Sequence, residues 1–216
     1  MSTPPKKILM VAVHPDDETL GGGGTLLKYI AAGHEVSCMY ITEGNEAQQR
    51  LIPVLHERYG FKETVRLKLP EVTLDDMSLS EMIGPIARII KRLQPEILFL
   101  PNRSDPHSDH RKTFDAFQAC IKSFRYPSLR KVLMMEVISE TDFAPALPEN
   151  VFIPHVFSDI SAYMEQKMEI LQVFETELLD SPYTRSLDTM RAYNRYRGSQ
   201  INAAYAECFM LIKEII

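Results

Sequence analysis

Short apolar or alternating runs of strand length alternate with segments whose apolar residues recur at helical spacing. This change of period, from two to about 3.6 residues, predicts strands that alternate with helices. The predicted strands are Lys7–Val13, Glu35–Thr42, Thr64–Leu69, Glu96–Leu100 and Val132–Ile138. The predicted helices are Leu20–Ala32, Glu46–Tyr59, Leu79–Leu93 and His110–Phe124, with Pro53 expected to kink the second helix or to mark its true start.

This alternation is typical of βαβ units, whose crossovers are right-handed. We therefore expect an α/β fold: a Rossmann-like, open and mainly parallel sheet with helices on both faces, in a three-layer α/β/α arrangement. In a doubly wound sheet the first and fourth strands flank the point where the strand order reverses, and ligands bind there at the carboxyl ends of the strands.

The pattern becomes less regular after about residue 142. The segments expected there are an extended stretch Val151–Phe157, a helix Tyr163–Leu178 capped by Ser158 and Asp159, a helix near Arg185–Gly198, and an apolar core or interface segment Cys208–Ile216. We expect a single domain over residues 1–216, in which the part from about 142 packs on the sheet.

Composition narrows the class of protein. The net charge is −5 and the chain has no basic block, so we expect no nucleic-acid partner. The three cysteines are far apart, which argues against a disulfide framework and favours a cytoplasmic location. No apolar run approaches the ~20 residues that span a bilayer, so we expect no membrane span. The sequence leaves the oligomeric state open, and a homo-oligomer is one alternative because small α/β enzymes commonly form symmetric oligomers.

A dense polar cluster follows the first predicted strand. His14, Asp16, Asp17 and Glu18 lie within five residues, and such carboxylates repel one another unless a cation lies between them, so we expect a metal ion. The glycines that follow, Gly21–Gly24, lack the order of a phosphate-binding loop. We interpret them as a device for close packing of a helix on the sheet.

A second cluster follows the fourth predicted strand and begins a helix. His107 and His110 are three residues apart and can share one side of a first helical turn. Asp105 and Asp109 lie beside them, and each can hold an imidazole ring by its second nitrogen. Because the first and fourth strands are expected to be neighbours, the two clusters should face each other across one crevice.

The stretches Ala12–Glu18 and Asp105–His110 together resemble a zinc-dependent N-deacetylase family (PIG-L/LmbE-like). This family includes N-acetylglucosaminyl-phosphatidylinositol de-N-acetylase and the deacetylases of mycothiol and bacillithiol synthesis. The first motif matches in full, and the second has Ser108 where the family usually has proline. The resemblance weakens between Thr42 and Thr73 and after Ser139.

The resemblance implies a role for each matched residue. His14, Asp17 and His110 would bind Zn²⁺, although such a site also accepts other divalent metals. Asp16 would be the general base that activates water, and a protonated His107, held by Asp109, would stabilise the oxyanion. Either Asp16 or His107 would protonate the leaving amine.

The substrate expected from the resemblance is a small molecule, an N-acetylated amino sugar or its conjugate. Asn45, Arg50 and Arg103 are candidate substrate contacts on the same rim, with a solvated helix arginine as the alternative for Arg50. The stretch 183–197, rich in arginine and tyrosine, suits either an anionic sugar or nucleotide or an oligomer interface.

Two other functions remain open at this point. One is a Rossmann-like nucleotide- or sugar-binding module without hydrolytic activity, in which the acidic loop is structural. The other is a metal-dependent hydrolase of another bond, such as a phosphoester. A single triad without further carboxylate ligands argues against a two-metal phosphatase.

Overall fold

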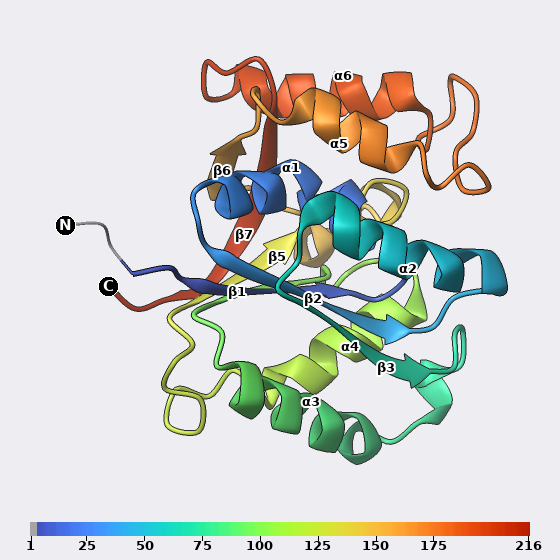
Figure 1. Ribbon diagram of the computed structural model, residues 1–216. Helices are drawn as coiled ribbons and strands as arrows, with labels where there is room; N and C mark the ends of the chain where they lie inside the picture. Colours follow the sequence, from blue (N-terminus) through green and yellow to red (C-terminus); the bar gives the residue numbers. More distant parts are fainter. Residues whose placement is uncertain (1–3) are drawn as a thin grey trace.

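The computed structural model describes residues 4–216. Its strands form one seven-stranded sheet in the order β3-β2-β1-β4-β5-β7-β6 (Figure 1). Strands β1 to β5 run parallel to one another, whereas β7 is antiparallel to both β5 and β6. The predicted α/β fold with a mainly parallel sheet is confirmed. The strands are β1 (Lys7–Ala12), β2 (Glu35–Thr42), β3 (Glu63–Leu69), β4 (Ile97–Leu100), β5 (Lys131–Met135), β6 (Val156–Asp159) and β7 (Ala206–Glu214).

Helices cover both faces of this sheet. Figure 1 shows α1 and α2 over one face and α3 and α4 over the other, with α5 and α6 stacked beyond α1. Each face has its own cluster of buried apolar side chains. In residues 4–216, no helix is both long and apolar enough to cross a membrane. The helices are α1 (Asp17–Ala31), α2 (Glu46–Tyr59), α3 (Leu79–Leu93), α4 (Ser108–Gln118), α5 (Met164–Leu171) and α6 (Leu187–Ser199).

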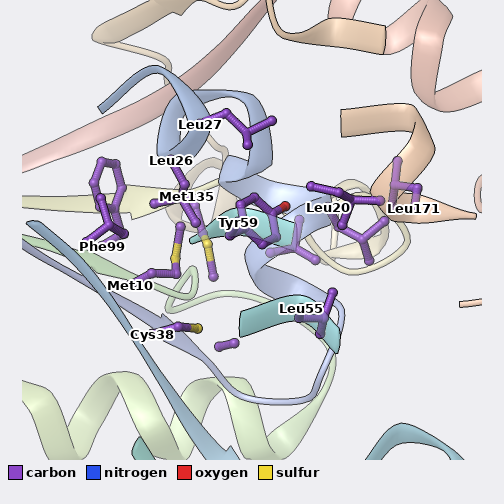
Figure 2. Packing of buried hydrophobic residues seen from close by; sticks show 14 of the residues in the cluster. Met10, Leu20, Leu26, Leu27, Cys38, Leu55, Tyr59, Phe99, Met135 and Leu171 are labelled. Carbon is purple, nitrogen blue, oxygen red and sulfur yellow. The ribbon is translucent and has the colours of Figure 1, made fainter. Parts of the chain in front are cut away.

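The glycines at the start of α1 let this helix lie close to its neighbours. A Cβ at Gly22 would lie 2.5 Å from Cε of Met10, and one at Gly24 would lie 2.8 Å from Cβ of Ile160. Real Cβ atoms do not approach so closely, so a larger residue at Gly24 would displace Ile160, whereas one at Gly22 would require the flexible end of Met10 to move. Figure 2 shows Leu20 and Leu26 of this helix and Met10 of β1 among the buried hydrophobic residues. The interpretation of Gly21–Gly24 as a packing device is confirmed.

The C-terminal part differs most from the predictions. Cys208–Ile216, expected as a core or interface segment, belongs mainly to β7, which lies between two other strands. Ser158 and Asp159 were expected to cap a helix, but they end β6 and pair with β7. The helix expected over Tyr163–Leu178 is α5 alone and ends at Leu171. Strand pairing with a distant segment overrides the local helix signal here.

The N-terminal elements agree with the predictions to within a few residues, except at two ends. Helix α4 stops at Gln118 rather than Phe124, whose side chain is exposed. Strand β5 stops at Met135, because the chain then leaves the sheet. Pro53 neither starts nor ends α2, since Asn45 and Gln48 form a capping box at its true start.

A buried ion pair ties the C-terminal part to α1. Lys167 donates to Glu207 at 2.8 Å and to the carbonyl oxygen of Leu20 at 3.2 Å. The carboxylate of Glu207 also accepts from the backbone N–H groups of Gly24 and Thr25. Both side chains are almost completely buried. The pair therefore holds the helix that begins at the candidate site.

We expect Glu207→Ala to lower the free energy of unfolding by about 3–5 kcal/mol, because it leaves the Lys167 ammonium buried without a carboxylate. Urea titration followed by circular dichroism measures this change. The exposed Glu57→Ala in α2 is the control and should change stability by less than about 0.5 kcal/mol. Equal effects of the two substitutions would contradict a stabilising role for the pair.

Candidate active site

The two polar clusters meet at the carboxyl ends of β1 and β4. These strands are neighbours at the point where the strand order reverses. The ring of His14 lies 4.5 Å from that of His107 and 5.3 Å from that of His110, measured between centroids. The expectation that the two loops face each other is therefore confirmed.

The carboxylate of Asp17 is fixed by the loop that carries it. Its Oδ2 accepts from the backbone N–H groups of Val13 and His14, each at 2.9 Å, and lies 3.3 Å from Nε2 of His110. Burial raises the pKa of Asp17, but the adjacent rings of His110 and His14 outweigh burial and lower the pKa. Asp17 is therefore an ionised carboxylate oriented by its own backbone.

His110 is held from its other side by Asp105. Nδ1 of His110 lies 2.8 Å from Oδ2 of Asp105, whose Oδ1 accepts from the Thr141 hydroxyl. Since the carboxylate accepts the Nδ1 proton, the ring presents a lone pair at Nε2 whenever that nitrogen has lost its proton, as it does on binding a cation. This buried Nε2 atom lies 3.3 Å from Asp17 but makes no hydrogen bond with it or with another group of the described residues. Burial lowers the pKa of His110, but Asp17 and Asp105 raise it well above its ordinary value.

Two overlapping sets of side chains bring donor atoms within 4.8 Å of one another. One is His14, Asp17 and His110, and the other is His14, His107 and Asp109. The first set suits a metal better, because Nε2 of His110 is otherwise unpartnered and Asp17 is held in place by backbone groups. Two imidazoles and one carboxylate leave open positions, which is typical of a catalytic rather than a structural site. The residues present therefore fit a divalent cation.

Asp16 adopts an unusual backbone conformation beside this site. Its φ is 153°, in a region that L-residues rarely occupy, and its side chain is almost fully buried. Such conformations cost about 1–3 kcal/mol and cluster at functional sites. Burial and the neighbouring Asp17 raise the pKa of the Asp16 carboxyl, against the opposing effect of Arg185.

The sequence did not indicate the partner of Asp16. Nη1 of Arg185 lies 2.6 Å from Oδ2 of Asp16 and 3.6 Å from the carboxylate of Glu177. Arg185 belongs to the stretch 183–197, which is rich in arginine and tyrosine. It comes from the segment before α6, 169 positions beyond Asp16, and no local pattern indicates this contact.

Asp109 does not hold His107 as expected. Its Oδ2 lies 3.3 Å from Nε2 of His14 and accepts from the backbone N–H of Val72 at 2.7 Å. Nδ1 of His107 instead accepts from the backbone N–H of Asp109. Burial lowers the pKa of His107, and the neighbouring rings of His14 and His110 lower it further. Asp109 acts against these effects and raises the pKa of His107, and its role in keeping His107 charged stays a prediction.

Glu18 supports the loop instead of lying in either set of metal donors. It accepts from the backbone N–H of Asp16 at 3.2 Å and from the Thr19 hydroxyl at 2.6 Å. The Thr19 hydroxyl accepts in turn from Tyr59 of α2. Burial raises the pKa of Glu18 to about 8. This chain of hydrogen bonds connects α2 to the backbone of Asp16.

The three candidate substrate contacts have other partners. The side chain of Asn45 caps α2, and that of Arg50 is 79% exposed and pairs with Glu46. Arg103 donates to the carbonyl oxygen of Glu149 at 2.7 Å. None of these contacts involves the histidine cluster, so a substrate role for the three residues stays a prediction.

We expect Asp105→Asn to weaken zinc binding about tenfold to a hundredfold, because the charged partner of His110 is lost. Competition with a chromophoric chelator measures the affinity. The exposed Asp115→Asn in the same loop–helix region should leave the affinity unchanged. An unchanged affinity in Asp105→Asn would show that this carboxylate does not support the ligand.

Two deacetylases are similar to this chain over nearly its whole length. Diacetylchitobiose deacetylase of Thermococcus kodakarensis is 23% identical over 94% of this chain and 81% of its own length. A structure of N,N'-diacetylchitobiose deacetylase from Pyrococcus horikoshii has a TM-score of 0.78 and 20% identity, covering 97% of this chain and 85% of that one.

The fold alone does not fix the reaction. GalB, the 4-carboxy-2-hydroxymuconate hydratase of Pseudomonas putida KT2440, also has a similar structure, with a TM-score of 0.73, 17% identity and 98% coverage of both chains. The sequence profile of the PIG-L family, described as GlcNAc-PI de-N-acetylase, matches residues 9–121, which contain both polar clusters. This match spans just over half of the chain and confirms the resemblance found in the motifs: the chain belongs to the PIG-L family.

Proposed function

We propose that this protein is a zinc-dependent deacetylase that hydrolyses the acetamide of an N-acetylated amino sugar or its conjugate. The family and the relatives named for diacetylchitobiose support this substrate class. The observation that carries the proposal is the convergence of His14, Asp17 and His110 beside the buried Asp16.

In this proposal, His14, Asp17 and His110 hold the cation. When bound there, the cation lowers the pKa of water and polarises the acetamide carbonyl. Asp16 accepts a proton from the attacking water, because it lies in the same loop as His14 and Asp17 but belongs to neither set of metal donors. The water oxygen bonds to the carbonyl carbon, the carbon–nitrogen bond breaks, and acetate and an amine leave.

His107 has a different part in the reaction. Its Nδ1 accepts a backbone N–H, so the neutral ring carries its proton on Nε2. We propose that this Nε2–H stabilises the carbonyl oxygen as negative charge develops there. A neutral donor in this position makes Asp16 the better source of the proton for the leaving amine.

Arg185 positions Asp16 in this proposal. We expect Arg185→Ala to lower kcat about tenfold to a hundredfold with little change in KM, because a misdirected base loses its alignment with the water. Arg185→Lys should recover part of kcat. Steady-state kinetics of acetate release separate the two constants, with the exposed Arg58→Ala as control. A rise in KM alone would instead assign Arg185 to substrate binding.

An acetate-release screen over N-acetylglucosamine conjugates, run with and without added Zn²⁺, tests the proposed function. We expect zinc-dependent release of equal amounts of acetate and free amine from at least one conjugate. Co-purified nucleotide together with the absence of metal would support the binding-module alternative. Hydrolysis of a phosphoester without any acetate release would contradict the proposed reaction.

We also propose a cytoplasmic location for this protein. The three cysteines are buried and unpaired, which supports a reducing, cytoplasmic compartment. A symmetric homo-oligomer stays a prediction, and light scattering after size-exclusion chromatography measures the assembly state.

A further inference from the structure

Just after β5 the chain makes a tight turn over residues 137–141, which we call the β5 turn. Strand β5 is parallel to β4, so the loops that follow these two strands lie at the same edge of the sheet, where the candidate active site is. The backbone N–H of Thr141 donates to the carbonyl oxygen of Val137 at 2.8 Å. The Thr141 hydroxyl accepts from the N–H of Val137 at 3.0 Å. These two hydrogen bonds close the turn.

Thr141 attaches the β5 turn to the side of the site that would hold the metal. Its hydroxyl donates to Oδ1 of Asp105 at 2.8 Å, and Oδ2 of the same carboxylate lies 2.8 Å from Nδ1 of His110. The side chains of Thr141 and Asp105 are both buried, so water does not compete for this contact. One carboxylate therefore connects the turn to a proposed metal ligand.

Ser139 attaches the same turn to the side of the site that holds the proposed base. The hydroxyl oxygens of Ser139 and Thr184 lie 2.7 Å apart and share a hydrogen bond. Thr184 precedes Arg185, whose guanidinium contacts Asp16 at 2.6 Å. The φ of Ser139 is 74°, in the left-handed region that residues other than glycine seldom adopt. Such a conformation persists where the surrounding contacts impose it, and it is typical of functional sites.

Glu140 lies between these two attachment points, and its carboxylate has no partner. Among the residues that the structure describes, none forms a hydrogen bond or an ion pair with this carboxylate. The side chain is partly buried but still accessible, and burial raises its pKa. The charges of His110, Asp17 and Arg185 also act on this pKa, which is consistent with a position near both sides of the site. A partly buried carboxylate favours a ligand that donates hydrogen bonds to it.

We propose that Glu140 binds the sugar of the substrate by accepting a hydrogen bond from at least one of its hydroxyl groups. This inference rests on the proposed function, because it places the sugar beside the acetamide. An ionised carboxylate only accepts hydrogen bonds, and sugar hydroxyls are donors. Because Ser139 and Thr141 fix the turn to both sides of the site, this contact would orient the acetamide toward the metal ligands and Asp16. The substrate class is then amino sugars with a free hydroxyl at the bound position, and simple N-alkyl acetamides are poor substrates.

Glu140→Ala tests this inference in two assays with methyl N-acetylglucosaminide. In the zinc-loaded protein, we expect KM for acetate release to rise about tenfold or more, with little change in kcat. In the metal-free protein, which leaves the sugar intact, an NMR titration should show a similar loss of affinity. Glu149→Ala, an exposed residue before β6, is the matched control and should change neither value. Sugar binding by the wild type without acetate release would contradict the proposed function alone. No sugar binding, or equal binding by Glu140→Ala, would overturn the inference.

Deoxy analogues of the sugar identify the hydroxyl that Glu140 contacts. We expect one of the 3-deoxy, 4-deoxy and 6-deoxy analogues to bind the wild type about as weakly as the parent sugar binds Glu140→Ala. The same analogue should lose little further affinity in Glu140→Ala, because both changes remove one hydrogen bond. Glu140→Gln should fall between the two proteins, since its amide oxygen still accepts. Additive losses for all three analogues would overturn the contact. A lower zinc affinity in Glu140→Ala would also overturn it, since Glu140 would then support the metal ligands.

Discussion

Asp16→Asn is expected to reduce the rate of acetate release by about a hundredfold to ten-thousandfold, the usual contribution of a positioned general base. The amide keeps the size of the side chain but cannot accept the proton of the attacking water. Because Asp16 belongs to neither set of converging donor atoms, the variant should still bind one equivalent of metal. Steady-state kinetics and elemental analysis of the same preparation measure both quantities.

The exposed Asp115→Asn serves as the control for this substitution and should keep full activity. If Asp16→Asn retained more than about a tenth of the activity, another group would have to be the base. If it instead lost the metal, Asp16 would be a ligand and the roles assigned to Asp16 and Asp17 would have to be exchanged.

His110→Ala is expected to abolish metal binding and lower activity about a thousandfold or more, because the cation supplies several kcal/mol of transition-state stabilisation. The substitution also leaves Asp17 and Asp105 buried without their shared partner. We therefore expect a lower thermal midpoint in metal-free protein as well. Elemental analysis, kinetics and thermal unfolding give three separate readouts.

His56→Ala in α2 is the matched control, since the His56 ring hydrogen-bonds to Thr64 of β3 and is in neither set of metal donors. It should keep metal and activity. A folded His110→Ala protein with normal metal content would contradict the ligand assignment, whatever its activity.

The parts of the site that were predictable come from short, local sequence patterns. His14 and Asp17 follow a buried strand, and His110 follows another, so strand order alone brings them together. Support of His110 by Asp105 was also foreseeable, because the two residues share one loop. The same reasoning did not anticipate the contacts of Asp109, whose carboxylate lies 3.3 Å from His14 while its backbone N–H donates to His107.

The C-terminal part was less predictable because its structure depends on contacts between distant segments. Strand β7 lies antiparallel between β5 and β6, and nothing local to Ala206–Glu214 specifies those two neighbours. The contact of Arg185 with Asp16 depends on how this part of the chain folds back over α1. The buried pair of Lys167 and Glu207 has the same origin, because each residue alone looks like an ordinary surface charge.

Titration of the metal-free protein with Zn²⁺, with acetate release from an N-acetylglucosamine conjugate as the readout, tests the central claim most directly. Our account predicts no release without metal, a linear rise as zinc is added, and a break at one zinc per chain. The same titration of His110→Ala should show no rise. Full activity in the metal-free protein, or no acetate from any conjugate in the zinc-loaded protein, would contradict the account.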